Sequence, residues 1–283
     1  SYTGEIPEQT EHITGSGSNR RYYRIKSASF SLIGVKGESI KENLAFIGLS
    51  AHFLQKGLPV PSVYAVSEDK TCYLQTDLGN ISLFNYIAEG IKSGDFSEKE
   101  KNMLRKTISL LPDFQFKGAQ DLDFSVCYPQ LEFDRRTVMW DLNYFKYYFL
   151  RPSGIDFSEQ LLEDDFEQMA VELLKENTHT FLYRDFQSRN VMIHENEPYF
   201  IDFQGGRKGP VYYDVASFIW QAKANFPDPL RKELVEVYIA ALRKYMQVNE
   251  EYFYRRLNLF LLFRNLQVLG AYGYRGIFEK KQH

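Results

Sequence analysis

Cysteine, histidine and long apolar segments are scarce in this sequence, and each scarcity excludes a class of protein. Only two cysteines, Cys72 and Cys127, occur among 283 residues. They are too few for a disulfide framework and lack metal-ligand spacing, so we interpret them as free thiols in a reducing compartment, by default the cytoplasm. The five histidines are scattered without metal spacing. No apolar run approaches the ~20 residues that cross a bilayer, so we expect no membrane partner.

An excess of charge of one sign is also missing. The formal net charge is −3, which gives no support for a nucleic-acid partner. The sequence is 44% hydrophobic and 25% charged, as is typical of a soluble globular protein. Its length suffices for one large domain or two small ones with a real core. We expect the abundant aromatic residues, 16% of the chain, to fill that core.

The most informative stretch extends from residue 181 to residue 204. It contains Asp185, Asn190 and Asp202 in a short span. Two apolar runs, Val191–Ile193 and Tyr199–Ile201, predict short strands joined by a turn at residues 196–198. Such a hairpin would bring the loop that carries Asp185 and Asn190 back beside Asp202.

This arrangement suits the transfer of a phosphoryl group from a nucleotide. The reaction needs a carboxylate that orients and deprotonates an acceptor hydroxyl, and hard oxygen ligands that hold Mg²⁺ against the phosphates. We predict that Asp185 is the base and that Asn190 and Asp202 bind the metal. Each of the three alone could be a polar loop residue that makes turn hydrogen bonds. Their order, spacing and strand context together favour the catalytic interpretation.

The order of these three residues resembles the kinase pattern of catalytic Asp, Asn and metal-binding Asp. Two departures are informative, since Tyr183 stands where protein kinases usually carry His and Gln204 where they carry Gly. The motifs Arg184-Asp-Phe-Gln-Ser-Arg-Asn and Ile201-Asp-Phe-Gln resemble the aminoglycoside phosphotransferase and choline kinase superfamily, which phosphorylates small molecules. With Gly209-Pro-Val-Tyr-Tyr-Asp, they look most like the anomeric N-acetylmuramate/N-acetylglucosamine kinases of bacterial cell-wall recycling.

The resemblance implies a two-lobed α+β fold of the protein-kinase type. A small N-terminal β-sheet lobe with one main helix, residues 1–79, would bind the nucleotide. A larger, mostly helical lobe, residues 80–283, would carry catalysis and the acceptor. ATP and Mg²⁺ are the implied cofactors. Main-chain atoms between Gln75 and Leu78 would contact the adenine, which makes Gln75 and Asp77 candidates for the nucleotide site. The oligomeric state stays open.

Several N-terminal residues are further candidates for nucleotide contacts. A glycine and serine loop ahead of two β-leaning runs could cover a phosphate, although such a loop is equally a flexible linker. Its residues are Gly15, Ser16, Gly17 and Ser18. Kinase-like lobes pair a strand lysine with a helix glutamate. Lys36 and Glu42 are the candidates, although Lys36 lies at a strand edge. Arg20 and Arg21 could contact phosphates or form a solvated pair.

The acceptor site is expected around the segment ahead of the catalytic loop, as in the resembled fold. Trp140, Tyr144 and Tyr147 form a stripe at helical spacing that could stack on a sugar, although such stripes are more often core. In the resembled family, an aspartate at the position of Asp214 buttresses the catalytic loop. The candidate acceptor residues are Asp141, Asn143, Tyr144, Gln187, Arg189 and Gln204.

These observations together predict a small-molecule kinase. The resemblance implies transfer of the γ-phosphate of ATP to a sugar hydroxyl, in particular the anomeric hydroxyl of an N-acetylhexosamine. One alternative is a kinase for choline or an aminoglycoside. The other is a catalytically inactive nucleotide-binding protein, for which the position of Lys36 is an argument.

Overall fold

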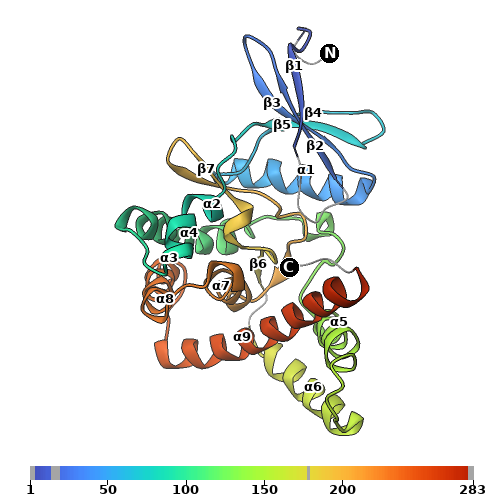
Figure 1. Ribbon diagram of the computed structural model, residues 1–283, viewed down its shortest axis with the longest axis vertical. Coiled ribbons are helices and arrows are strands. Elements are labelled where there is room, and N and C mark those ends of the chain that lie inside the picture. Colours follow the sequence, from blue (N-terminus) through green and yellow to red (C-terminus); the bar gives the residue numbers. More distant parts are fainter. Residues whose placement is uncertain (1–3, 14–19, 177–178, 280–283) are drawn as a thin grey trace.

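An antiparallel sheet of five strands forms one end of the molecule in the computed structural model, which describes residues 4–13, 20–176 and 179–279 (Figure 1). Its strand order is β1-β2-β3-β5-β4. The two β-leaning runs that follow the glycine and serine loop form β2 and β3, whereas β1 was not predicted because its residues are mostly exposed and show no apolar alternation. The strands are β1 (Gln9–Ile13), β2 (Arg21–Lys26), β3 (Ser31–Lys36), β4 (Val63–Val66) and β5 (Cys72–Thr76).

Helix α1 (Ile40–Gln55) joins the sheet to the rest of the molecule. It begins where the Ser39 side chain accepts the backbone N–H of Glu42, and it ends before Gly57, whose φ of +71° favours glycine. The Phe46 ring stacks on Phe203 with a centroid separation of 4.9 Å. Phe53 is completely buried. This helix therefore buries one face against both parts of the chain.

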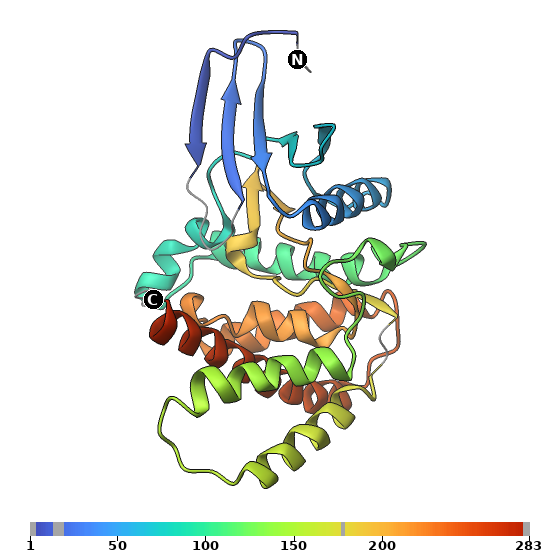
Figure 2. The same cartoon turned by 90° about the vertical axis from the view of Figure 1, so that its right-hand side faces the viewer.

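The remaining chain is mostly helical and holds two short two-stranded sheets (Figure 2). Strand β6 pairs with β9, and β7 pairs with β8. The helices are α2 (Leu83–Tyr86), α3 (Ala88–Ser93), α4 (Glu98–Phe116), α5 (Arg135–Phe145), α6 (Glu159–Leu173), α7 (Tyr212–Ile219), α8 (Asp228–Leu242) and α9 (Glu250–Gly273). The strands are β6 (Thr180–Leu182), β7 (Val191–His194), β8 (Glu197–Phe200) and β9 (Arg207–Gly209). Short 3-10 turns lie at Phe124–Val126, Ser188–Asn190 and Ala222–Ala224, and π-helical turns at Lys146–Leu150 and Tyr274–Phe278.

Two helices have ends or interiors with local explanations. Helix α4 contains Pro112 and continues through this residue to Phe116. Burial of Leu111 and Phe114, both fully removed from solvent, compensates for the N–H that proline lacks. Helix α6 begins after Ser158, whose side chain caps it by accepting the N–H of Leu161.

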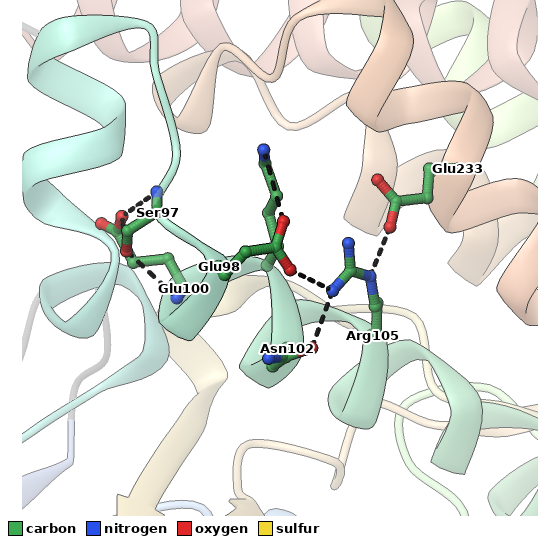
Figure 3. A network of polar contacts seen from close by, with 7 residues as sticks. Ser97, Glu98, Glu100, Asn102, Arg105 and Glu233 are labelled. Atoms are coloured by element: carbon green, nitrogen blue, oxygen red, sulfur yellow. Dashed lines mark hydrogen bonds and ion pairs between the residues drawn. The ribbon is translucent and has the colours of Figure 1, made fainter.

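Helix α4 is fixed at its first turn and to α8 by a polar network (Figure 3). Ser97 and Glu100 form a reciprocal capping box, in which the Ser97 N–H donates to Glu100 Oε2 at 2.8 Å. The guanidinium of Arg105 binds Glu98 at 3.0 Å and also binds Glu233 of α8. Such exposed ion pairs each contribute little, so burial of apolar residues stabilises this helix pair.

Helices α5, α6 and α9 lie at the end of the molecule opposite the sheet (Figures 1 and 2). Helix α9 approaches the end of α5 so closely that a Cβ on Gly273 would fall 2.0 Å from the carbonyl oxygen of Tyr148. Glycine is required at this contact. Among the described residues, no helix has both the length and the apolar character needed to cross a membrane.

Candidate active site

The predicted hairpin is present and brings the three candidate catalytic residues together. Val191 pairs with Phe200 and His194 with Glu197. The turn lies at Glu195 and Asn196, one residue earlier than expected. Their positive φ values of 51° and 61° are those of a two-residue hairpin turn. The N–H of Ile201 donates to the carbonyl oxygen of Asn190 at 3.0 Å, which places Asn190 directly beside the chain that leads into Asp202.

Asp185, Asn190 and Asp202 form a cluster of hard oxygen donors. The Asn190 amide Nδ2 donates to the carbonyl oxygen of Asp185 at 2.8 Å, which fixes the loop between them. Burial raises the pKa of Asp202, and the negative charge of Asp185 raises it further, whereas the hydrogen bond from Gln204 lowers it. The two carboxylates therefore repel each other, and a cation beside them would relieve that repulsion.

This donor set fits Mg²⁺ bound together with phosphates. No group of three His, Cys, Asp or Glu side chains that could hold a metal occurs in the described part of the chain. Mg²⁺ does not need such a group, because it is usually held by one or two carboxylates and by substrate phosphates. Asp202 and Asn190 could supply the protein's share of the ligands.

Asp214, in the first turn of α7, binds the main chain of the loop that leads to Asp185. Its carboxylate accepts the backbone N–H groups of Tyr183 at 2.7 Å and of Arg184 at 2.9 Å. Burial raises the pKa of Asp214 to about 7, although both hydrogen bonds oppose that shift. Arg184 has a φ of +79°, which a residue with a side chain rarely adopts, so these two hydrogen bonds stabilise a strained turn.

Tyr183, in the place of the usual kinase histidine, makes a contact that the sequence did not reveal. Its buried hydroxyl donates to the carbonyl oxygen of Ile201 at 2.5 Å. Tyr183 therefore links the loop before Asp185 to the residue before Asp202, and fixes the relative positions of the two carboxylates.

A cleft of about 320 Å³ opens between the sheet and this cluster. The cleft is lined by two of the candidate nucleotide-binding residues, Gln75 of β5 and Asp77 of the segment that follows β5. The Asp77 carboxylate is engaged by Arg24, with Nε at 2.7 Å from Oδ2 and Nη2 at 3.0 Å from Oδ1. Although burial opposes ionisation, the hydrogen bonds from Arg24 and Ser31 lower the pKa of Asp77. Its side chain therefore holds the segment in place and leaves main-chain atoms to face a ligand.

The expected pair of Lys36 and Glu42 is not found. Lys36 is the last residue of β3, where its side chain is exposed, and it does not line the cleft. Ile33 and Val35 occupy the buried side of this strand. Glu42 instead forms an ion pair with Arg20, whose Nη2 lies 3.2 Å from Glu42 Oε1. The sequence left the role of Arg20 open between phosphate binding and a solvated pair, and its side chain is in fact buried.

Gln204 lies between the two lobes rather than among the candidate acceptor residues of α5. Its Nε2 donates to Asp202 Oδ1 at 2.7 Å and to Glu42 Oε1 at 3.4 Å. It also lines the cleft, as does the exposed Arg189. Gln187 is half-buried on the same loop. The glycine and serine loop at residues 15–18 lies outside the described residues.

The candidate acceptor residues on α5 are connected to the catalytic loop through one ion pair. Asp141 Oδ1 accepts a hydrogen bond from Arg184 Nη2 at 2.8 Å, and Arg184 directly precedes Asp185 in the sequence. Tyr144 packs against Tyr148 with ring centroids 4.8 Å apart, and Asn143 is half-buried.

Two of the three rings of the aromatic stripe, Trp140 of α5 and Tyr147 of the π-helical turn that follows it, lie outside the core. Trp140 is 54% exposed and Tyr147 is 51% exposed. The neighbouring apolar residues Leu142 and Phe145, which are three positions apart and so share one helix face, are buried. The two exposed rings are therefore available for contacts outside the core.

Comparison with known proteins identifies relatives along most of the chain. The profile of the family described as phosphotransferase enzyme family, APH, matches residues 10–250. The N-acetylmuramate/N-acetylglucosamine kinase of Pseudomonas aeruginosa is 25% identical over 232 residues, which are 80% of this chain and 64% of that protein. The chain thus spans less than two thirds of that relative's length. The kinase of the same name from Neisseria meningitidis serogroup B is 24% identical over 276 residues, 94% of this chain and 79% of the other.

Solved structures show the same fold at low sequence identity. A choline kinase from Cryptosporidium parvum Iowa II has a TM-score of 0.63 at 13% identity, covering 94% of this chain and 85% of that one. An amicoumacin kinase in complex with AMP-PNP, Ca²⁺ and Ami has a TM-score of 0.69 at 11% identity, covering 98% and 84%. These likenesses confirm the predicted two-lobed, kinase-like α+β fold. The family profile matches well over half of the residues of this chain, so the chain belongs to the phosphotransferase enzyme family.

Proposed function

We propose that this protein is an ATP- and Mg²⁺-dependent kinase that phosphorylates a sugar hydroxyl. The observation that carries the proposal is the cluster of Asp185, Asn190 and Asp202, in which Asn190 and Asp202 line the cleft and Asn190 is bonded to the Asp185 main chain. Family membership supports phosphoryl transfer, and the amicoumacin kinase of the same fold, whose structure contains AMP-PNP and Ca²⁺, supports a nucleotide and a divalent cation as ligands.

Each catalytic side chain has one task in this scheme. Asp185 accepts the proton of the acceptor hydroxyl and orients the oxygen for attack on the γ-phosphate. Asp202 and Asn190 would hold Mg²⁺, which would neutralise charge on the phosphates. Asp214 and Tyr183 keep the loop in position through their hydrogen bonds. Catalysis then consists of positioning and charge neutralisation, with no covalent intermediate on the protein.

The acceptor that we propose is an N-acetylhexosamine, phosphorylated at its anomeric hydroxyl. The names of the relatives from Pseudomonas aeruginosa and Neisseria meningitidis support this choice. The exposed rings of Trp140 and Tyr147 could stack on a sugar, and Asp141 lies beside the catalytic loop through its ion pair with Arg184. A neutral sugar would be recognised by stacking and hydrogen bonds alone.

A coupled assay of ADP formation with a panel of acceptors tests the proposal. The panel holds N-acetylglucosamine, N-acetylmuramate, glucose, choline and an aminoglycoside, and Asp185→Asn serves as the matched inactive control. We expect turnover with the N-acetylated sugars and a sugar 1-phosphate in the phosphorus NMR spectrum of the product. A sugar 6-phosphate, or turnover only with choline or the aminoglycoside, would refute the acceptor assignment. Absence of Mg²⁺-dependent turnover with every acceptor would refute the kinase.

A further inference from the structure

A buried arginine occupies the side of the cleft where a kinase-like lobe needs a cation. Arg20 immediately precedes β2, and only 7% of its surface is exposed. Its Nη2 lies 3.2 Å from Glu42 Oε1 and donates to the Glu42 carbonyl oxygen at 3.0 Å. A guanidinium stays charged at any physiological pH, so this positive charge is permanent inside the cleft wall.

The surroundings of Arg20 connect it to the candidate metal site. Its guanidinium carbon lies 5.9 Å from the centroid of the Phe46 ring. Its partner Glu42 accepts a hydrogen bond from Gln204, whose amide also donates to Asp202. Arg20 and Asp202 both line the cleft. A chain of polar contacts therefore extends from the sheet, across α1, to the metal-binding carboxylate.

The other basic side chains near the cleft are less suited to bind a phosphate. Among the described residues, the arginines that line the cleft are Arg20, Arg24 and Arg189. Arg24 is occupied by Asp77, by the Asn80 side chain at 2.5 Å and by the Gly79 carbonyl oxygen at 3.0 Å. Arg189 is exposed on the catalytic loop. Lys36 is exposed at the end of β3 and is not among the residues that line the cleft.

We propose that Arg20 supplies the charge that binds the non-transferred phosphates of the nucleotide, in place of a lysine on β3, with Glu42 holding it there. This inference rests on the proposed function only in requiring that the cleft binds a nucleotide. The five N–H donors of a guanidinium allow contact with Glu42 and with a phosphate oxygen at once, which the three rotating donors of a lysine achieve less rigidly. Glu42 thus acts as a positioning residue for Arg20.

Calorimetric titration of ATP, ADP and adenosine into the wild type, Arg20→Met and Lys36→Met tests the assignment. We expect Arg20→Met to weaken ATP and ADP binding by about 100-fold, since charge-assisted hydrogen bonds to phosphate are lost. Adenosine affinity should change by less than about twofold, because adenosine has no phosphate. Lys36→Met, which removes a positive charge from the neighbouring strand, should leave all three affinities unchanged. The affinities of Arg20→Lys for ATP and ADP should lie between those of Arg20→Met and the wild type, and its affinity for adenosine should be that of the wild type.

Three results would overturn the assignment. Equal losses for adenosine and ATP in both Arg20 variants would show that Arg20 only maintains the fold of the cleft. Unchanged ATP affinity in Arg20→Met would exclude a phosphate contact. A weakened ATP affinity in Lys36→Met would return the role to the lysine. Should Arg20→Met not fold, the same comparison of ATP with adenosine in Arg20→Lys decides. Wild-type protein that binds ATP in this pattern but phosphorylates no acceptor would refute the proposed function while supporting the role of Arg20.

Discussion

Replacing Asp214 by asparagine should separate the stability of this protein from its activity. The carboxylate accepts two backbone N–H groups of the catalytic loop, at 2.7 Å and 2.9 Å. An amide has the same shape but one acceptor oxygen, so one of the two N–H groups would face an NH₂ group. A hydrogen bond to a charged group contributes roughly 1.5–3 kcal/mol, so we expect kcat to fall about 10- to 100-fold.

The burial of Asp214 should also make the free energy of unfolding of the wild type depend on pH. Burial raises the pKa of Asp214 from an ordinary 3.8 to about 7, so the folded protein keeps this proton to a higher pH than the unfolded chain does. The free energy of unfolding therefore decreases as the pH rises from about 4 to about 7. A difference of roughly three pKa units corresponds to a loss of about 4 kcal/mol. The asparagine variant has no such titration.

Urea unfolding of the wild type and of Asp214→Asn at a series of pH values measures this difference. Between about pH 4 and pH 8 the wild type should lose about 4 kcal/mol relative to the variant. Asp228→Asn is the matched control, since the same change is made on a side chain that is 92% exposed. The free energy of unfolding of this control should differ little from that of the wild type. Parallel pH profiles for the wild type and Asp214→Asn would refute the raised pKa.

Three further outcomes follow from the catalytic cluster and the acceptor. Asp185→Asn should lower kcat by at least ~10²-fold in the turnover assay while nucleotide affinity stays unchanged, and near-normal turnover would exclude Asp185 as the base. Asp202→Ala should abolish Mg²⁺-dependent ATP binding in calorimetry and Asn190→Ala should weaken it, so an unchanged affinity in Asp202→Ala would exclude this metal site. The KM of N-acetylglucosamine, which carries no charge, should be insensitive to salt, unlike that of a cationic acceptor. Removal of its acetamide group should cost on the order of 1–3 kcal/mol of binding free energy.

Local sequence patterns predicted the catalytic part of the structure well. The apolar runs on either side of the turn at residues 195–196 form the expected hairpin, and α5 buries Leu142 as its spacing predicts. Both features depend on residues close together in the chain, where turn chemistry and periodicity act directly. The expected turn was displaced by one residue, because Glu195 adopts a positive φ that its residue type does not favour.

Contacts between distant segments could not be predicted in the same way. The ion pair of Arg20 with Glu42 joins the start of β2 to α1, and that of Arg184 with Asp141 joins the catalytic loop to α5. Neither pair has a spacing that identifies it, since an arginine's long side chain can reach many positions. Lys36 was chosen from the general kinase pattern although the sequence already placed it at a strand edge, and the structure confirms that it lies at the exposed end of β3.

The ring of Phe53 has a consequence for how this chain unfolds. Phe53 belongs to the N-terminal part of the sequence, yet its ring contacts Phe114 at 5.4 Å, Phe181 at 5.0 Å and Phe203 at 5.3 Å, all in the C-terminal part. A fragment that ends near residue 79 would expose this ring and Phe46, and the complementary fragment would lose the surface that covers its own rings. The sheet and the helices are therefore not independent folding units, and heating should melt them in one cooperative transition.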